Sequence, residues 1–348
     1  ADPLLGFRMQ KGVEILQFAK PLRFAKRLQV AAALLPLAIG GWLAGCTKPP
    51  ASLTLPISSW PGYEYFYLAE QKGLARAEGL ELKTLEFAHP QDIVHAYLRG
   101  EVAVAPLTTV EVVDVCARVP ERCPVVVLVL DESLGGDQVM ARPGIASIAA
   151  LRGRRVAVMP STLGPFVLSR ALEQHGLSLQ DVQLRTINLG AMASALAQGD
   201  VEAAAIYPPF SVQAAEKARA TVLFDSRRIP GEVFDVLAVD PALLQEQPDV
   251  FVRLVRSWQA AHALRRSRPE QAVPLMARRE GLTPAEFTAT EQGLRYPGLA
   301  DQRALLAPDG PLQRNLAAVQ RVQEQLGLLT PGAPLPSVSD VAVIAATR

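Results

Sequence analysis

Residues 58–82 read SSWPGYEYFYLAEQKGLARAEGLEL, and this stretch decides the fold class. An apolar strand predicted at 53–57 stops just before it, a Pro-Gly turn follows, and a short helix then leads into a second strand. In α/β proteins, ligands collect outside the carboxyl ends of strands, where a loop passes into a helix. Aromatic faces at such a loop can sandwich a small polar molecule, so we expect Trp60 and Tyr63 to contact a ligand.

Two further tyrosines in this stretch, Tyr65 and Tyr67, have two interpretations. They either crowd the same aromatic corner as Trp60, or they belong to the core of the helix that follows the turn. The spacing alone does not separate these readings, because a helix of this length presents rings to both sides.

Strands and helices keep alternating after this stretch and predict a βαβαβ unit. The expected elements are a strand at 80–87, a helix at 91–99 and a short buried strand at 102–105. Thr108 and Thr109 stand at the end of the last strand and precede a helix at 110–117. Their hydroxyl groups are suited to cap that helix, and its free N–H groups would point toward the same cleft as Trp60.

An uninterrupted apolar run at 125–130 is typical of a strand that is covered on both faces. The segment 131–137 breaks the pattern with a Gly-Gly pair and ends at Asp137, and a strand resumes at 138–141. This segment is either a loop that places Asp137 beside a ligand or an ordinary hairpin turn.

A second unit of the same kind starts with a strand at 156–158. Ser161, Thr162 and Gly164 then form a hydroxyl-rich turn before a helix at 166–175. Backbone N–H groups at such a turn make an anion-binding nest. The two hydroxyl groups serve as helix caps, as ligand contacts, or as both.

Several short motifs recur in a fixed order within residues 51–329. They are SWPGYE at 59–64, YLA at 67–69, KGL at 72–74, EGL at 78–80 and GDVEAA at 199–204. Together they resemble the ABC-type nitrate, sulfonate and thiamine-pyrimidine (NMT1/THI5-like) periplasmic solute-binding proteins. The resemblance implies an α/β, two-lobed type II periplasmic-binding-protein fold with a helical C-terminal buttress. It also implies that the Ser161-Thr162 loop contacts the ligand.

The chain departs from that family after the strand expected at 201–206. Many members carry Trp-Glu-Pro there, whereas this chain has Tyr207 followed by two prolines. Tyr207 keeps an aromatic ring with a hydroxyl group, but the carboxylate is missing. Asp235 precedes a strand at 236–239 that should return to the first lobe. With Asp137 it would balance an amine on the ligand, or else it is an ordinary cap or hinge residue.

These elements predict a division of the chain into five segments. The segments are an N-terminal extension with signal peptide and lipobox at 1–46, a tether at 47–52, the first part of lobe 1 at 53–141, lobe 2 at 142–235, and a return to lobe 1 with C-terminal helices at 236–348. The C-terminal helices have proline near their starts, where it is tolerated, and Trp258 lies on an apolar stripe that predicts a core position.

The N-terminal segment reads as a lipoprotein signal. Basic residues precede an apolar run at 30–43, and the sequence Leu-Ala-Gly then leads to Cys46. The run is shorter than the roughly 20 residues that a membrane span needs. We expect Cys46 to carry a lipid and to hold the protein on the periplasmic side of the cell envelope, at the outer membrane in a Gram-negative host.

The remaining residue types exclude several functions. Cys116 and Cys123 are close enough in sequence to form a local disulfide in an oxidising compartment, or they are two buried thiols. The four histidines lack ligand spacing, so we expect no metal and no cofactor. A formal net charge of +1 argues against a nucleic-acid partner.

The sequence therefore predicts a lipid-anchored receptor that closes on a small polar molecule and delivers it to the permease subunits of an ABC importer. The ligand class stays open among sulfonate, nitrate, pyrimidine and amine. An alternative is a lipoprotein that reports the solute to a membrane signalling protein. An enzyme of small metabolites on the same fold is a further alternative, although no Gly-x-Ser-x-Gly, Walker or dinucleotide motif occurs.

Replacing the lipobox cysteine tests the anchor. Cys46→Ser should move the processed protein from the membrane fraction to the soluble fraction, because no thiol is left to acylate. The measurement is flotation of cell membranes followed by immunoblotting, with Cys123→Ser as the matched control. Flotation of the Cys46→Ser protein with membranes would contradict the lipid anchor.

Overall fold

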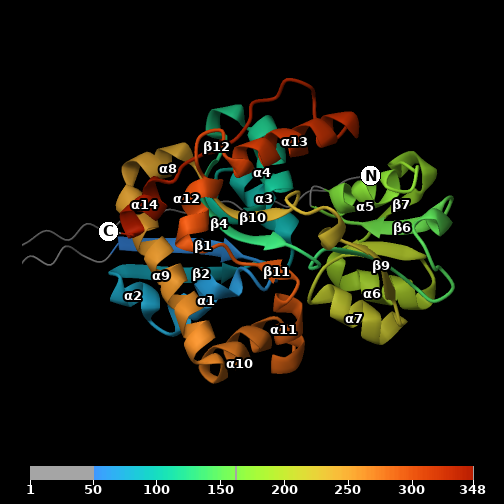
Figure 1. Cartoon of the computed structure of the whole chain (residues 1–348), viewed down its shortest axis with the longest axis horizontal. Helices are drawn as coiled ribbons and strands as arrows, with labels where there is room; N and C mark the ends of the chain where they lie inside the picture. Colours follow the sequence, from blue (N-terminus) through green and yellow to red (C-terminus); the bar gives the residue numbers. More distant parts are fainter. Residues whose placement is uncertain (1–50, 161–162, 348) are drawn as a thin grey trace, which may run out of the picture. The chain divides into compact units, whose positions relative to one another are not determined.

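The computed structural model describes residues 51–160 and 163–347, which form two α/β lobes (Figure 1). The predicted signal, the lipobox at Cys46, most of the tether, Ser161 and Thr162 lie outside the described residues. None of the helices in the described ranges is long and apolar enough to cross a membrane.

The first lobe, as described, is built on five strands and two short strands of two residues each. They are β1 Ala51–Ile57, β2 Leu80–Glu86, β3 Val104–Thr108, β4 Val125–Ser133, β10 Phe234–Val239, β11 Leu294–Arg295 and β12 Ser337–Val338. β1 and β2 pair in parallel, whereas β10 lies between β3 and β4 and is antiparallel to both. The helices between these strands are α1 Glu64–Gln71, α2 Leu74–Ala77, α3 Pro90–Leu98 and α4 Thr109–Arg118. β3 and β10 are buried along their whole lengths, as their apolar sequences predict.

The second lobe contains one five-stranded sheet in the order β7-β6-β8-β5-β9. Its strands are β5 Gln138–Ala141, β6 Arg155–Val158, β7 Gln183–Thr186, β8 Ala203–Ile206 and β9 Thr221–Asp225. Its helices are α5 Gly164–Glu173, α6 Leu189–Gln198 and α7 Phe210–Ala218. β6 runs parallel to β7 and β8, while β5 is antiparallel to β8 and β9. This is the second α/β unit that the sequence predicts.

The C-terminal third is helical, as expected. The helices are α8 Pro241–Glu246, α9 Pro248–Ser267, α10 Pro269–Arg279, α11 Pro284–Glu291, α12 Leu299–Leu305, α13 Pro311–Gln325 and α14 Val341–Ala346. Short 3-10 turns lie at Pro120–Arg122, Ala149–Leu151, Leu179–Asp181 and Ser226–Arg228. α9 packs against α1, α2, α10 and α14, so it buttresses the first lobe, and Trp258 is buried in that lobe's core.

The boundary between the lobes differs from the sequence expectation. β5 was expected to close the first lobe at residue 141, but Gln138–Ala141 pairs with β8 and β9 in the second sheet. The interpretation of 131–137 as a hairpin is therefore wrong, because β4 and β5 belong to different sheets. A strand, a glycine turn and another strand look the same in sequence whether the chain folds back or crosses over. The chain returns at β10, which begins at Phe234 rather than after Asp235.

Two segments connect the lobes: the first crossing, residues 134–137 between β4 and β5, and the second crossing, residues 226–233 between β9 and β10. The two crossings lie side by side and are hydrogen bonded to each other. The hydroxyl groups of Ser133 and Ser226 are 2.8 Å apart, and the Gly135 amide donates to the Ser226 hydroxyl at 2.7 Å. Ser133 ends β4, whereas Ser226 follows β9. A motion between the lobes must therefore pass through this short paired segment.

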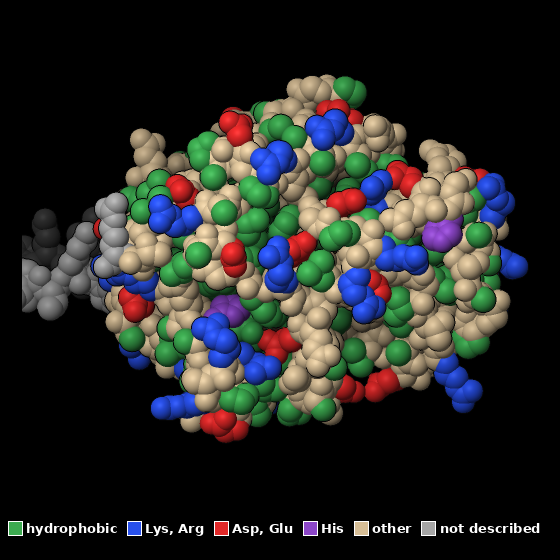
Figure 2. Space-filling model, viewed as in Figure 1, with side chains coloured by type: hydrophobic (Ala, Val, Ile, Leu, Met, Phe, Trp, Pro, Cys, Tyr) green, Lys and Arg blue, Asp and Glu red, His purple; other side chains and the backbone are tan. Residues whose placement is uncertain are grey.

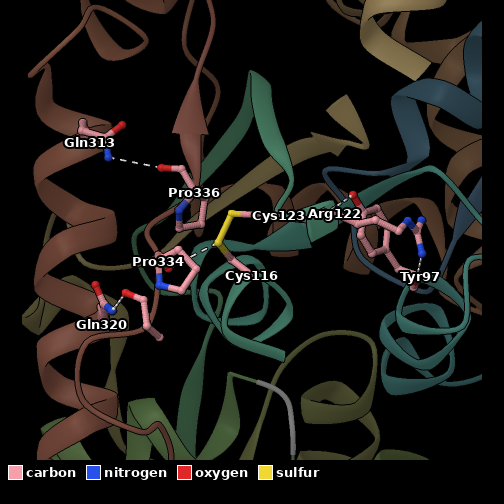
Figure 3. Close-up of a disulfide and its surroundings, with 9 residues drawn as sticks. Tyr97, Cys116, Arg122, Cys123, Gln313, Gln320, Pro334 and Pro336 are labelled. Carbon is pink, nitrogen blue, oxygen red and sulfur yellow. Dashed lines mark hydrogen bonds between the residues drawn. A yellow bond between two sulfur atoms is a disulfide. The ribbon is translucent and has the colours of Figure 1, made fainter. Parts of the chain in front are cut away.

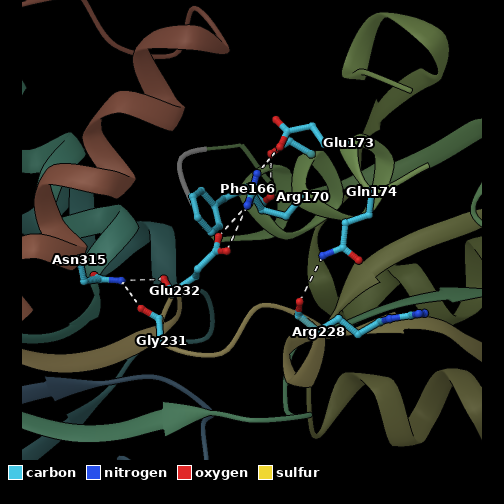
Figure 4. Close-up of polar contacts among 9 residues, drawn as sticks. Phe166, Arg170, Glu173, Gln174, Arg228, Gly231, Glu232 and Asn315 are labelled. Atoms are coloured by element: carbon cyan, nitrogen blue, oxygen red, sulfur yellow. Dashed lines mark hydrogen bonds and ion pairs between the residues drawn. The ribbon is translucent and has the colours of Figure 1, made fainter. Parts of the chain in front are cut away.

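The C-terminal helix α13 also holds the returning crossing (Figure 4). The Asn315 amide donates to the backbone oxygens of Gly231 at 2.8 Å and Glu232 at 3.1 Å. From the second lobe, Arg170 of α5 donates to the Glu232 carboxylate at 2.7 Å. The returning segment is thus held from both lobes.

A disulfide joins the end of α4 to the turn that follows it (Figure 3). Cys116 and Cys123 are bonded, with their Cα atoms 4.1 Å apart. The backbone oxygen of Pro334 lies 3.3 Å from the Cys116 sulfur. Gln313 and Gln320 of α13 donate to the backbone oxygens of Pro336 and Ala333, so α13 fixes the C-terminal segment over the disulfide.

Candidate functional site

A cavity of about 30 Å³ lies between the two lobes. Its described lining comes from the β1–α1 loop, the starts of α3 and α4, the two crossings, and the second-lobe segments before α5 and after β8. The lining residues are Ser58, Ser59, Trp60, Tyr63, Pro90, Thr108, Glu111, Asp137, Leu163, Tyr207 and Asp235. This space admits one or two water molecules, so a larger ligand requires the lobes to move apart.

One wall of the cavity includes Thr108 and Asp235, which belong to a row of polar side chains across three adjacent strands of the first sheet; the third member of the row, Asp131, does not line the cavity. Asp235 of β10 is paired in register with Thr108 of β3 on one side and with Asp131 of β4 on the other. Residues paired across strands project from the same face of a sheet, so Asp131 and Asp235 are neighbours. Both are almost fully buried.

The aromatic loop after β1 donates hydrogen bonds to this row. The Tyr63 hydroxyl donates to Oδ1 of Asp235 at 2.5 Å, and the Trp60 indole N–H donates to Oδ2 of Asp131 at 3.1 Å. Each bond leaves the second carboxyl oxygen buried, Oδ2 of Asp235 and Oδ1 of Asp131, and these two carboxyl groups bond to each other. The loop that the sequence singled out therefore orients two acidic groups.

Two glycines allow this close packing. A Cβ atom at Gly62 would lie 1.9 Å from Oδ2 of Asp131, and one at Gly136 would lie 2.9 Å from the Trp60 ring. Both distances are far below van der Waals contact, so a side chain at either position would displace the carboxyl group or the indole. Gly136 belongs to the first crossing, which is thereby pressed against the Trp60 ring.

The start of α4 carries an acid of its own. Thr108 is the N-cap residue and accepts from the Glu111 amide at 3.2 Å, while Oε2 of Glu111 accepts from the Thr108 amide at 2.8 Å. This is the reciprocal capping box, so the cap predicted at Thr108 is confirmed. A carboxylate therefore already occupies the N-terminal end of α4.

The opposite wall is formed by Asp137, Leu163 and Tyr207. Asp137 follows the Gly-Gly pair, and its backbone amide donates to the Ser133 hydroxyl at 3.1 Å. Its Oδ2 atom is buried with no hydrogen-bond partner. The Tyr207 ring meets the Trp60 ring edge to face, with centroids 5.5 Å apart and an interplanar angle of 84°.

Burial raises the pKa values of all four acids. It raises the pKa of Asp137 to about 7 and that of Glu111 to about 7, against opposing hydrogen bonds from Ser133 and Thr108 respectively. It raises the pKa of Asp131 to about 8, where the bond from Trp60 opposes it. The pKa of Asp235 is raised most clearly, by burial first and then by the facing Asp131. These acids thus hold protons near neutral pH.

The described lining contains no Lys, Arg or His. Two arginines, Arg295 of β11 and Arg227 of the segment after β9, are paired with Glu132 and Asp225 respectively. Across residues 51–160 and 163–347, no group of three or more His, Cys, Asp or Glu side chains is arranged to hold a metal ion. The acids are therefore not neutralised by a protein cation.

Most of the ligand residues predicted from sequence line this cavity. Those that do so are Trp60, Tyr63, Thr108, Asp137, Tyr207 and Asp235. Thr109 is buried inside α4 and Gly164 begins α5, and neither lines the cavity, while Ser161 and Thr162 lie outside the described residues. Ligand contact by these residues stays a prediction.

Tyr65 and Tyr67 lie away from the cavity. The Tyr65 hydroxyl donates to Glu291 at 2.7 Å and its ring stacks on His262, with centroids 3.5 Å apart. Tyr67 packs against the first core, under the guanidinium of Arg279. Their interpretation as core residues of the helix is therefore the right one, since α1 is buried on most of its sides, with Tyr65 fully and Tyr67 partly buried.

Sequence reasoning missed Glu111 and Asp131, as well as the lining residues Ser58, Ser59, Pro90 and Leu163. Glu111 had a local signal, because Thr followed three residues later by Glu is the capping-box pattern. Asp131 had a weaker one, an acid directly after an apolar run. Its pairing with Asp235 depends on strand register and leaves no trace in the local sequence.

Comparison with known families identifies this architecture. The family model described as NMT1/THI5 like matches residues 60–272, which is more than half of the chain. The chain belongs to this family. A Brucella abortus (strain 2308) protein named "Putative binding protein" is 24% identical over 225 residues, covering 64% of this chain and 69% of that protein. An Escherichia coli (strain K12) protein named "Putative aliphatic sulfonates-binding protein" is 31% identical over 154 residues, covering 44% of this chain and 47% of that protein.

Solved structures share the periplasmic-binding-protein fold. The alkanesulfonate-binding protein SsuA from Xanthomonas axonopodis pv. citri, bound to MOPS, aligns with a TM-score of 0.67 at 17% identity over 86% of this chain and 98% of that one. The E. coli sulphonate-binding protein SsuA aligns with a TM-score of 0.68 at 18% identity over 84% and 91%. The desulfurization enzyme DSZB also aligns, with a TM-score of 0.65 at 18% identity over 86% and 100%. The fold of this NMT1/THI5-like chain is thus used by binding proteins and by an enzyme.

The raised pKa of Asp137 predicts how stability depends on pH. The folded protein keeps this proton up to about pH 7, whereas the unfolded chain loses it near pH 4, so stability falls as pH rises through that window. Asp137→Asn cannot ionise, so without ligand it should exceed the parent at pH 8 by about 1–4 kcal/mol and match it at pH 4. Urea unfolding at both pH values measures this.

The exposed Asp200→Asn variant is the matched control and should follow the parent at both pH values. If Asp137→Asn were less stable than the parent at pH 8, the carboxylate would be a needed charged acceptor. That result would contradict a buried acid held protonated in the folded protein.

Proposed function

We propose that this NMT1/THI5-like chain is a solute-binding receptor of the cell envelope that delivers a small molecule to an ABC importer. The observation that most supports this proposal is a cavity lined by residues of both lobes, at the point where the chain crosses between them. A ligand that touches both walls binds more tightly when the lobes are closed, so it shifts the equilibrium toward that form. The permease subunits would recognise the closed form.

Two observations support the proposed location. Cys46 in its lipobox would anchor the receptor on the periplasmic side, and the E. coli SsuA structure is named as that of a periplasmic binding protein. The visible face carries interspersed basic and acidic side chains (Figure 2). Together with the net charge of +1, this favours a small-molecule ligand over nucleic acid.

We propose further that the receptor does not transform its ligand. The enzyme DSZB shares the fold, so fold alone does not separate the two functions. The described cavity lining offers hydroxyl and carboxyl groups but no Cys, His or Lys, so a nucleophilic Cys or Lys and a His base are missing from it. Recovery of a bound compound unchanged after prolonged incubation supports the receptor, and its conversion supports the enzyme.

Two tyrosines that each donate to a buried carboxylate provide a matched test of the site. Tyr63 does so in the cavity and Tyr65 does so outside it. Tyr63→Phe should weaken ligand binding about 10-fold, because Asp235 loses the bond that orients it, whereas Tyr65→Phe should leave affinity unchanged. Thermal shift against sulfonates, nitrate, pyrimidines, amines and amino acids identifies the ligand class, and titration of a hit gives the affinities.

Equal affinity in both variants and the parent would place the ligand elsewhere. A screen in which no compound raises the melting temperature would contradict the receptor itself.

A further inference from the structure

We propose that the ligand is a small organic cation, with a protonated nitrogen bound between Asp137 and Asp235 and its carbon skeleton against Trp60 and Tyr207. This inference rests on the proposed receptor function and names the class of its solute. It differs from the sulfonates named for the E. coli relative and the SsuA structures.

Two buried acids line the cavity without a cationic partner. Asp137 and Asp235 are 4% and 2% exposed; Oδ2 of Asp137 has no hydrogen-bond partner, and Asp235 bonds only to Tyr63 and to the facing carboxyl of Asp131. Buried polar atoms in native proteins are nearly always satisfied, and exceptions call for an explanation. A ligand nitrogen that carries several N–H groups would bond to both acids at once.

An anion would find no cationic side chain in the described lining, which has no Lys, Arg or His. Ser161 and Thr162, which lie outside the described residues, carry no charge. Of the helix starts that contribute to the lining, those of α3 and α5 have no side-chain cap, whereas that of α4 is already capped by the Glu111 carboxylate. A sulfonate placed there would meet acids on both walls.

Rings complete the site for a cation. Trp60 and Tyr207 meet at nearly right angles, and both line the cavity together with Asp137 and Asp235. A cation over an indole or phenol face is stabilised by the ring quadrupole, and the effect grows when water is excluded. The tryptophan is held in place by its bond to Asp131.

Protonation would couple to binding. The titratable groups around Asp137 in the site are Asp131, Asp235, Glu111, Tyr63 and Tyr207. Next to the Trp60 loop lie Glu64, Arg279 and Glu280. Next to the crossings lie the Arg227–Asp225 and Arg295–Glu132 ion pairs. Acids predominate in this set. A bound cation favours the ionised carboxylates, so its affinity should rise as pH rises through the range where Asp137 titrates.

Matched probes test the charge of the ligand. Calorimetry of the mature protein at pH 8 would use methylammonium, guanidinium and benzylammonium, each against an anion of similar size, namely nitrate, methanesulfonate and benzenesulfonate. At least one cation should bind at least about 100-fold more tightly than every anion. Its affinity should fall at least about 10-fold at pH 5.5, since protonated acids no longer attract it.

Variants assign the effect to the cavity. Asp137→Asn should weaken the best cation by at least about 10-fold and flatten its pH dependence, while Asp200→Asn at an exposed site should match the parent. Circular dichroism and the melting temperature of Asp137→Asn show that it is folded.

The outcomes separate this inference from the receptor function. Binding of an anion more tightly than every cation, weakened by Tyr63→Phe, would overturn the cation and leave the receptor standing. Binding of no probe up to 10 mM would overturn both. A best cation that binds Asp137→Asn as tightly as the parent would also overturn the inference.

Discussion

The strands that carry the chain between the lobes are neighbours in one sheet. β4 leaves the first lobe and β10 returns to it, and the two are paired along their lengths. The ends of both strands must therefore meet at one place, and whatever residues stand there face each other. Asp131 and Asp235 lie there, and Asp137 lies in the first crossing, directly before β5. The acidic character of the site follows from this topology together with two acids that are close in sequence, Asp131 and Asp137, and a third, Asp235, that is far from both.

Burying several carboxyl groups away from water lowers the stability of the fold, and no basic side chain in the described lining neutralises them. The protein limits that cost by holding protons, which is why burial raises the pKa of each acid. A structure designed only for stability would place apolar residues there, so retention of the acids points to a role in binding. The hydrogen bonds from Trp60 and Tyr63 orient Asp131 and Asp235 but bring no positive charge to them.

Local signals predicted much of this architecture. Apolar runs gave most of the strands, proline and glycine marked most helix ends, and the rings after β1 marked one wall of the cavity. The capping threonine was also correct, because a cap depends only on its neighbours in sequence.

What local signals could not supply was the partner of each strand. The crossing before Gln138 looked like a hairpin, and the pairing of Asp131 with Asp235 was invisible, since both depend on which sheet a strand joins. Tyr65 and Tyr67 remained ambiguous for a similar reason, because burial of a helix face is decided by α9 and α10, which lie far along the chain.

The central claim is that buried, protonated acids give up protons to receive a cation. Calorimetric titration of benzylammonium at pH 7 in phosphate and in Tris, buffers that differ in their heats of ionisation, measures this directly. We expect a buffer-dependent heat that corresponds to release of at least about 0.5 proton per bound ligand, since Asp137 has a pKa of about 7 and is half protonated at this pH. A heat that is the same in both buffers, or one that corresponds to proton uptake, would contradict it.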